Sequence, residues 1–231
     1  MNVGLIMAGG CGERTQNTTP KQFVEINGIP VIIHTLQAFQ QHPQIDEICC
    51  VCVDGWQHHL LSLTQKYNIS KVKYITTGGP TAHDSIFCGL QMMQDIYPSD
   101  TLIVQHDAVR PLVTPQLISD CIATTQKYGN AIAYIPSRDV LVHTIDDTSS
   151  TIAIPRSTTK TAQTPNGYRL NHMLTLHRRA KAKNSPPSTA TYNLLIESGE
   201  TVHLYHGSEI NLKITHNIDF AIAETLLQRT K

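Results

Sequence analysis

The chain has 231 residues, and its 18 Lys and Arg residues are balanced by 18 Asp and Glu residues, which gives a formal net charge of zero. This length allows one large domain or two small ones with a real hydrophobic core. A neutral chain without a basic or acidic tail argues against nucleic acid or an anionic membrane as the main partner. Hydrophobic residues make up 40% of the chain, in short runs, and none approaches the roughly 20 apolar residues that span a bilayer.

The N-terminus predicts the compartment in which the protein works. Its apolar stretch ends at Gly9-Gly10 and no basic segment precedes it, so we expect no secretory signal. Three of the six cysteines lie within the apolar run 48–53, where Cys49 and Cys52 have Cys-x-x-Cys spacing but belong to an expected buried strand. These features favour buried, reduced thiols over a metal site or disulfides, and they predict a cytoplasmic protein.

Short apolar runs alternate with helical patterns along most of the chain. This alternation is typical of a Rossmann-like α/β fold, a mostly parallel sheet with helices on both faces. The expected strands lie at 5–8, 48–53, 72–75 and 102–105. The expected helices begin at Pro30, cover 57–67 and 86–97, and begin again at Thr114-Pro115.

The second half of the chain contains a segment of different character. Residues 137–187 are rich in Thr, Ser, Arg, Lys and Pro and show weak periodicity. We interpret them as an extended arm on a single domain that covers 1–231. Regular structure is then expected to resume with strands at 201–205 and 212–215 and a closing amphipathic helix that carries Ile218, Ile222 and Leu226.

A glycine-rich loop follows the first strand, Ala8-Gly9-Gly10-Cys11-Gly12-Glu13-Arg14. Glycines let the backbone approach an anion with its N–H groups, while Arg14 and the later Lys21 add positive charge, so the loop suits a triphosphate. Thr15 stands where the dinucleotide fingerprint needs its third glycine, which disfavours an NAD-dependent reductase. The alternative is a tight strand-to-helix turn with surface cations.

Asp107 and Arg110 come directly after the strand at 102–105. Open α/β sheets bind ligands at this end of their strands. A carboxylate there can hold Mg²⁺ bridged to nucleotide phosphates, and an arginine can clamp a phosphate or a hydroxyl. The alternative is a structural ion pair at the end of the strand.

Two weaker signals lie elsewhere in the chain. Gly79 and Pro80 precede Ser85 near the start of a helix, where backbone groups and a hydroxyl can bind a base or a ribose; alone, this is a capped helix start. Lys213 lies within the expected strand 212–215, near the sheet. Its alternative role is that of a charged gatekeeper on an edge strand.

In order and spacing, these segments together resemble the sugar-alcohol-phosphate cytidylyltransferases over nearly the whole chain. The resemblance rests on Ala8-Gly9-Gly10-x-Gly12-x-Arg14, Pro20-Lys21-Gln22, Gly78-Gly79, His106-Asp107-Ala108-Val109-Arg110-Pro111, Gln163-Thr164-Pro165 and Leu212-Lys213-Ile214-Thr215. Asp54-Gly55-Trp56 with Lys66-Tyr67, and the segment ending at His216, are more similar to the ribitol-phosphate branch than to the 2-C-methyl-D-erythritol 4-phosphate branch.

The resemblance implies that CMP passes from CTP to ribitol 5-phosphate, giving CDP-ribitol and pyrophosphate, with Mg²⁺ as cofactor. The alternative acceptor is 2-C-methyl-D-erythritol 4-phosphate. The roles that the resemblance implies are catalysis by Arg14, Lys21 and Lys213, and nucleotide binding by Ala8, Gly9, Gly10, Gly12, Gly79, Pro80 and Ser85. The acceptor side comprises Asp107, Arg110, Thr164 and Arg156, with Asp107 also near the metal. The arm resembles a dimerisation segment that sends Arg156 into the site of a second copy, so a homodimer is expected.

Three positions depart from the family pattern. Ala82 stands where an arginine is usual, Val140 replaces a threonine, and Ala190 replaces an aspartate. The changes at Val140 and Ala190 remove hydrogen-bonding groups that would help to select a polyol. Together with Ala82, they motivate a further alternative, a pseudoenzyme that binds CTP without turnover.

Overall fold

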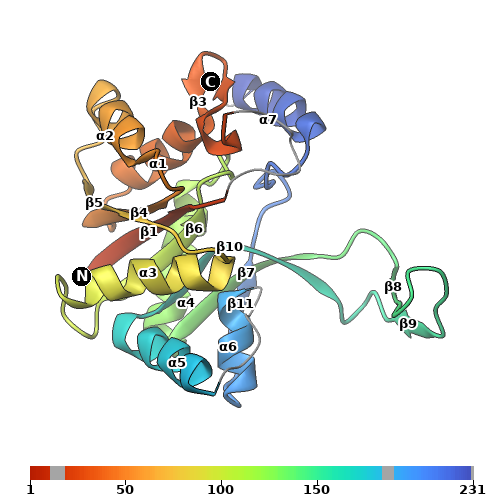
Figure 1. The fold of residues 1–231 in the computed structure, drawn as a ribbon. Coiled ribbons are helices and arrows are strands. Elements are labelled where there is room, and N and C mark those ends of the chain that lie inside the picture. Colours follow the sequence, from red (N-terminus) through yellow and green to blue (C-terminus); the bar gives the residue numbers. More distant parts are fainter. Residues whose placement is uncertain (11–18, 184–189, 230–231) are drawn as a thin grey trace.

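A seven-stranded sheet forms the centre of the computed structural model, which describes residues 1–10, 19–183 and 190–229 (Figure 1). Its spatial order is β11-β7-β10-β6-β1-β4-β5. The strands are β1 (Asn2–Ala8), β4 (Glu47–Cys52), β5 (Val72–Thr77), β6 (Leu102–Asp107), β7 (Asn130–Pro136), β10 (Lys160–Arg169) and β11 (Leu204–His206). Only β10 runs antiparallel to its neighbours in this sheet, so the mostly parallel sheet expected from the sequence is confirmed.

Helices cover both faces of the sheet, as expected. One face carries α1 (Val31–Gln41), α2 (Gln57–Lys66) and α4 (Pro115–Tyr128), and the other carries α3 (Ala82–Gln94), α5 (Leu170–Ala182) and α6 (Thr191–Glu197). Because successive strand residues point to opposite faces, Ile6 of β1 packs in the first layer and Leu5 in the second. The cysteines of β4 are buried free thiols.

The starts of two helices show how local sequence fixes the fold. Thr114 caps α4 by accepting a hydrogen bond from the Leu117 amide at 3.3 Å, and Pro115 occupies the first turn, as the sequence predicts. Pro30 was expected to open a helix, but it pairs with Glu25 in a short ladder, and α1 begins one residue later. The ladder joins β2 (Glu25–Ile26) to β3 (Ile29–Pro30).

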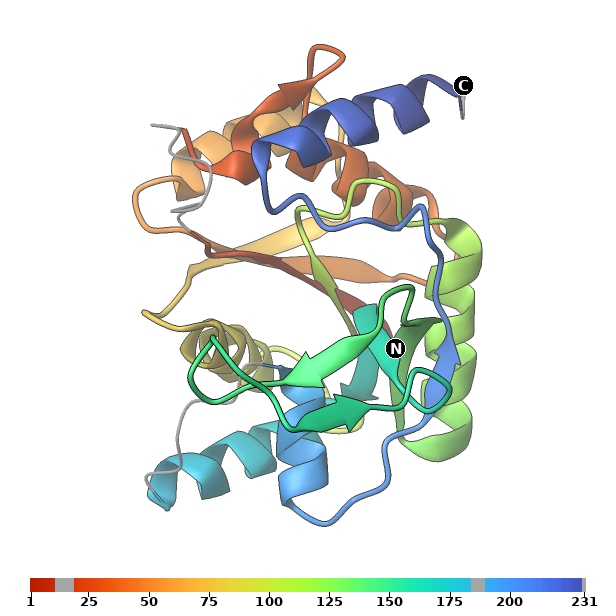
Figure 2. The ribbon, with the colours of Figure 1, turned by 90° about the vertical axis from the view of Figure 1, so that its right-hand side faces the viewer.

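The arm is shorter than the segment 137–187 that the sequence predicts. A hairpin of β8 (Leu141–His143) and β9 (Ile152–Ile154) projects away from the body (Figures 1 and 2). From Lys160 onward, however, β10 pairs with β6 and β7, and α5 packs against α3. The polar composition of this segment does not indicate a buried strand. Polar side chains such as Gln163 and Asn166 are nevertheless buried there, with hydrogen-bonding partners inside the sheet region.

The chain after α6 also differs from expectation. The segment 212–215 forms no strand and runs as irregular chain, held where the Ile214 amide donates to the Val109 carbonyl at 2.9 Å. The closing helix exists as α7 (Asn217–Arg229), but it buries Ala223, while Ile218 and Ile222 are exposed. Among the residues that the structure describes, no helix has the length and apolar character to cross a membrane.

Candidate active site

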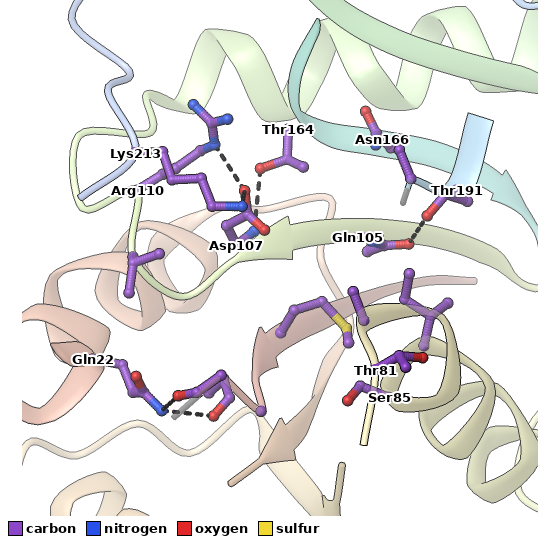
Figure 3. A pocket seen from close by; sticks show the side chains of 18 of the residues that line it. Gln22, Thr81, Ser85, Gln105, Asp107, Arg110, Thr164, Asn166, Thr191 and Lys213 are labelled. Carbon is purple, nitrogen blue, oxygen red and sulfur yellow. Dashed lines mark hydrogen bonds and ion pairs between the residues drawn. The ribbon is translucent and has the colours of Figure 1, made fainter. Parts of the chain in front are cut away.

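A cavity of about 650 Å³ opens at the carboxyl ends of β1 and β6, beside the start of α3 (Figure 3). Because Met7 and Asp107 pair across the two strands, the glycines after β1 and the acidic loop after β6 meet at this edge. Of the residues predicted from the sequence, the cavity wall contains Ala8, Gly9, Gly10, Lys21, Gly79, Pro80, Ser85, Asp107, Arg110, Thr164 and Lys213.

Three predicted residues are not part of that wall as described. Gly12 and Arg14 lie outside the described residues. Arg156 lies at the base of the arm, where its Nε donates to the Ser137 carbonyl at 3.1 Å, and it does not line the cavity. Within this chain, the structure therefore does not bring Arg156 to the site.

Asp107, Arg110 and Lys213 form the charged end of the cavity. The Asp107 Oδ2 atom lies 2.9 Å from Arg110 Nε and 3.2 Å from Lys213 Nζ. Burial raises the pKa of the Asp107 carboxyl, but the charges of Lys213 and Arg110 outweigh it and hold the pKa well below its usual range. The carboxylate is therefore ionised, and the predicted ion pair exists inside the cavity.

Lys213 reaches this end because the chain is anchored on both sides of it. On one side, Asn211 donates from Nδ2 to the Thr164 carbonyl at 2.7 Å, and its own carbonyl accepts from Arg110 Nη1 at 2.8 Å. On the other side, Ile214 is buried and bonded to Val109. The edge-strand role considered for Lys213 is wrong, since its segment is not a strand.

The described start of the glycine loop, residues 8–10, is held by a residue to which the sequence assigned no role. Gln22 is 1% exposed, and its Nε2 donates to the carbonyls of Ala8 at 2.8 Å and Gly10 at 3.1 Å. It belongs to the short 3₁₀ helix η2 (Lys21–Phe23), whose Phe23 ring stacks on Trp56 with centroids 4.9 Å apart. These contacts place Lys21 at the cavity. In the sequence, this role of Gln22 is indicated only by its place as a polar residue between Lys21 and Phe23.

The start of α3 forms the wall of the cavity that faces Asp107 and Lys213 (Figure 3). Thr81 caps this helix by accepting from the Asp84 amide at 3.1 Å, and the Gly79 amide donates to Ser85 Oγ at 3.1 Å. A Cβ atom at Gly9 would lie 3.1 Å from Ser85 Oγ, closer than ordinary van der Waals contact, so glycine eases the close approach of the two segments. Backbone groups and one hydroxyl thus face the cavity together, as the sequence predicts.

A second set of polar residues lines the wall and was missed entirely. Gln105 of β6, Asn166 of β10 and Thr191 of α6 form the neutral end of the cavity. The hydroxyls of Tyr168 and Thr191 both donate to Gln105 Oε1 at 2.7 Å. Only the fold brings these residues together, because they come from three separate elements.

The cavity offers few ligands for a metal. Among the described residues that line it, Asp107 is the sole carboxylate, and the described chain has no cluster of three His, Cys, Asp or Glu side chains suited to a metal. Proteins often hold Mg²⁺ through one or two carboxylates, with substrate phosphates and water completing the shell. One ionised carboxylate therefore fits Mg²⁺ that arrives with a nucleotide and does not fit a permanently bound ion.

Comparison with solved structures shows the class of protein to which this fold belongs. The structure of 4-diphosphocytidyl-2C-methyl-D-erythritol synthase from Anaerococcus prevotii DSM 20548 superposes with a TM-score of 0.84 at 24% identity, covering 98% of this chain and 96% of that one. The architecture is therefore that of an IspD-like nucleotidyltransferase.

Sequence comparison then gives the family. Residues 3–229 match the family described as IspD, 2-C-methyl-D-erythritol 4-phosphate cytidylyltransferase, and the chain belongs to that family. The ribitol-5-phosphate cytidylyltransferase of Vibrio parahaemolyticus serotype O3:K6 is 36% identical over 228 residues, covering 98% of this chain and 96% of the relative. The 2-C-methyl-D-erythritol 4-phosphate cytidylyltransferase of Clostridium acetobutylicum is 34% identical over 230 residues, covering 99% and 98%. The resemblance found in the sequence is confirmed.

Proposed function

We propose that this protein transfers CMP from CTP to ribitol 5-phosphate, releasing pyrophosphate and forming CDP-ribitol. The observation that carries the proposal is the meeting of Lys213, Asp107 and Arg110 in one cavity with the glycine-rich loop. The similarity to ribitol-5-phosphate cytidylyltransferases over nearly the full length supports the choice of acceptor.

The proposed reaction is a displacement at phosphorus. An oxygen of the acceptor phosphate forms a bond to the α-phosphorus of CTP, and the bond from that phosphorus to the bridging oxygen of the β-phosphate breaks, so pyrophosphate leaves. A phosphate oxygen is already ionised at neutral pH, so the step needs no general base. Catalysis then consists of positioning and of neutralising charge in the transition state.

The cations have distinct proposed tasks in this displacement. Lys213 would face the α-phosphate, where negative charge develops, while Lys21 and Arg14 would hold the β- and γ-phosphates. Lys21 lines the cavity beside the glycine loop, which supports its role. Asp107 would hold Mg²⁺, and that ion, when bound, neutralises phosphate charge.

The two substrates would occupy different walls. We assign the nucleotide to Ala8, Gly9, Gly10, Gly12, Gly79, Pro80 and Ser85. The acceptor phosphate would lie near Arg110 and Thr164. Arg110 already uses Nε for Asp107 and Nη1 for the Asn211 carbonyl, which leaves Nη2 to bind the acceptor phosphate.

We further propose that the protein is a cytoplasmic homodimer joined through the arm. The hairpin exposes the apolar side chains of Val140, Leu141, Val142, Ile145 and Ile152. Such a group on a projecting segment would be covered by a second copy, and Arg156 at the base of the arm would then approach that copy's cavity. Sedimentation equilibrium tests this: a dimer is expected, and a monomer at micromolar concentration would reject it.

The runner-up acceptor is 2-C-methyl-D-erythritol 4-phosphate, which the family description and the Clostridium acetobutylicum relative favour. Pyrophosphate release should be measured from CTP and Mg²⁺ with each acceptor and with none. The proposal expects the highest kcat/KM with ribitol 5-phosphate. CTP binding without turnover on any acceptor would instead indicate a pseudoenzyme, and NADH binding tighter than CTP would revive the reductase.

A further inference from the structure

The neutral end of the cavity consists of buried side chains on rigid elements. Gln105 is 5% exposed, Asn166 is 4% exposed and Thr191 is 2% exposed, yet all three line the cavity. Gln105 and Asn166 are paired in register across β6 and β10. Asp107 lies two residues after Gln105 on β6, and Thr164 lies two residues before Asn166 on β10. The Asp107 amide donates to the Thr164 hydroxyl at 3.1 Å, so the neutral end continues directly from the charged end.

The hydrogen bonds of Gln105 leave one half of its amide unused. Oε1 accepts from the hydroxyls of Tyr168 and Thr191, both at 2.7 Å, a distance typical of O–H···O bonds. Nε2 has no acceptor among the described residues, and Figure 3 shows it on the side of the amide that faces Asp107. Nε2 is not among the fully enclosed polar atoms of the described residues, so its two donors open to the cavity and can bind a ligand there.

The distribution of charge along the cavity matches one substrate better than the other. Lys21, Arg110 and Lys213 supply positive charge, whereas Gln105, Thr191 and Asn166 offer only neutral hydrogen-bonding groups. A polyol phosphate has the same division, one anionic phosphate and an uncharged chain of hydroxyls. Hydroxyl oxygens accept hydrogen bonds from amide N–H groups.

The position of Gln105 favours the acceptor over the ribose of CTP. Gln105 lies on the wall formed by β6, β10 and α6, together with Thr164 and Arg110. The proposed nucleotide contacts at Gly9, Gly79 and Ser85 belong to the facing wall, at the end of β1 and the start of α3; Figure 3 shows Ser85 on that side.

We propose that Gln105 donates from Nε2 to a hydroxyl of the acceptor's polyol chain and is a specificity residue of the reaction, with the Thr191 hydroxyl orienting its amide. This inference rests on the proposed function in one respect, that the acceptor is a polyol phosphate. It assigns the neutral end to the uncharged part of that acceptor.

The test compares Gln105→Met with Tyr168→Phe. The first substitution keeps the length of the side chain and removes the amide, both its Nε2 donor and its Oε1 acceptor, whereas the second removes one buried hydroxyl from the same hydrogen-bond cluster and leaves the Gln105 amide in place. For Gln105→Met we expect the KM for ribitol 5-phosphate to rise roughly tenfold, with the Kd for CTP, measured calorimetrically without acceptor, changed by less than about twofold. For Tyr168→Phe the acceptor KM should stay within about threefold of the wild-type value.

Two results would overturn the proposal. Equal KM increases in both variants would make Gln105 merely structural, and a weaker Kd for CTP with an unchanged acceptor KM would move it to the nucleotide. If Gln105→Met does not fold, Gln105→Glu keeps the accepting oxygen without the donor, and the same acceptor-specific rise is expected. If the wild-type protein uses only 2-C-methyl-D-erythritol 4-phosphate, the proposed function fails, while the KM comparison with that acceptor still decides the role of Gln105.

Discussion

The two ends of the cavity differ in how the chain holds them. At the charged end, Lys213 extends from an irregular segment, and its side chain is 45% exposed. At the neutral end, Gln105 and Asn166 lie on paired strands and are almost fully buried. Cations on anchored loops are positioned for the phosphate charge that develops in the transition state, whereas amides on paired strands are positioned to bind neutral groups. We therefore expect the charged end to determine the rate and the neutral end to determine the choice of acceptor.

Removal of a cation from the charged end should have the largest effect on turnover. Lys213→Ala and Lys21→Ala should each lower kcat by at least roughly 100-fold, the scale of losing one preorganised charge contact to the transition state. Steady-state pyrophosphate release measures this. Lys73→Ala, an exposed lysine of β5, is the matched control and should behave as wild type. Near-wild-type turnover in both site variants would contradict the proposed role of the charged end.

Arg110→Lys changes the residue that joins the acceptor phosphate site to the Lys213 segment. The change keeps the positive charge but loses the fork that joins Asp107 to the Asn211 carbonyl. We expect kcat/KM for the acceptor to fall roughly 10- to 30-fold, since both the acceptor phosphate site and the Lys213 segment lose support. The KM for the polyol phosphate should rise more than that for CTP. A change confined to CTP would move Arg110 to the nucleotide side.

Buried histidines give a smaller effect on stability. Burial lowers the pKa of His106, behind the charged end, to about 4 and that of His177, packed against His83 and Phe87 of α3, to about 3. Below the unfolded pKa of about 6.5, the unfolded chain binds protons that the folded chain does not, so the free energy of unfolding falls as the pH falls. Each histidine contributes up to about 1.4 kcal/mol per pH unit.

Urea unfolding near pH 7 and near pH 5.5 tests this stability effect. His177→Leu should reduce the pH dependence of the unfolding free energy by up to about 1.4 kcal/mol per pH unit. His58→Leu, which replaces an exposed histidine of α2, should leave it unchanged. An unaltered slope in His177→Leu would show that this histidine is not held neutral.

The charged end was largely predictable from the sequence. The sequence predicts Asp107 and Arg110 at the site because they follow a strongly apolar strand, and such strand ends meet at one edge of a parallel sheet. Lys213 was found through its resemblance to a family segment, although the strand expected around it does not form. Its place depends on contacts with Asn211 and Val109, which a local apolar pattern cannot reveal.

The neutral end could not be predicted in the same way. Gln105 occupies a strand position where a hydrophobic residue is usual, and its partners Tyr168 and Thr191 lie more than 60 residues away in sequence. The same limit explains the error in the extent of the arm. The residues of β10 are polar, and their burial depends on partners in β6 and β7 rather than on their own periodicity.

A competition between the two acceptors measures directly which polyol phosphate the protein prefers. The protein is incubated with CTP, Mg²⁺ and equal concentrations of ribitol 5-phosphate and 2-C-methyl-D-erythritol 4-phosphate, and the two cytidine diphosphate products are quantified by mass spectrometry. We predict that CDP-ribitol exceeds the other product by at least about tenfold, the equivalent of one or two discriminating hydrogen bonds. An excess of the methylerythritol product, or no product at all, would contradict the account.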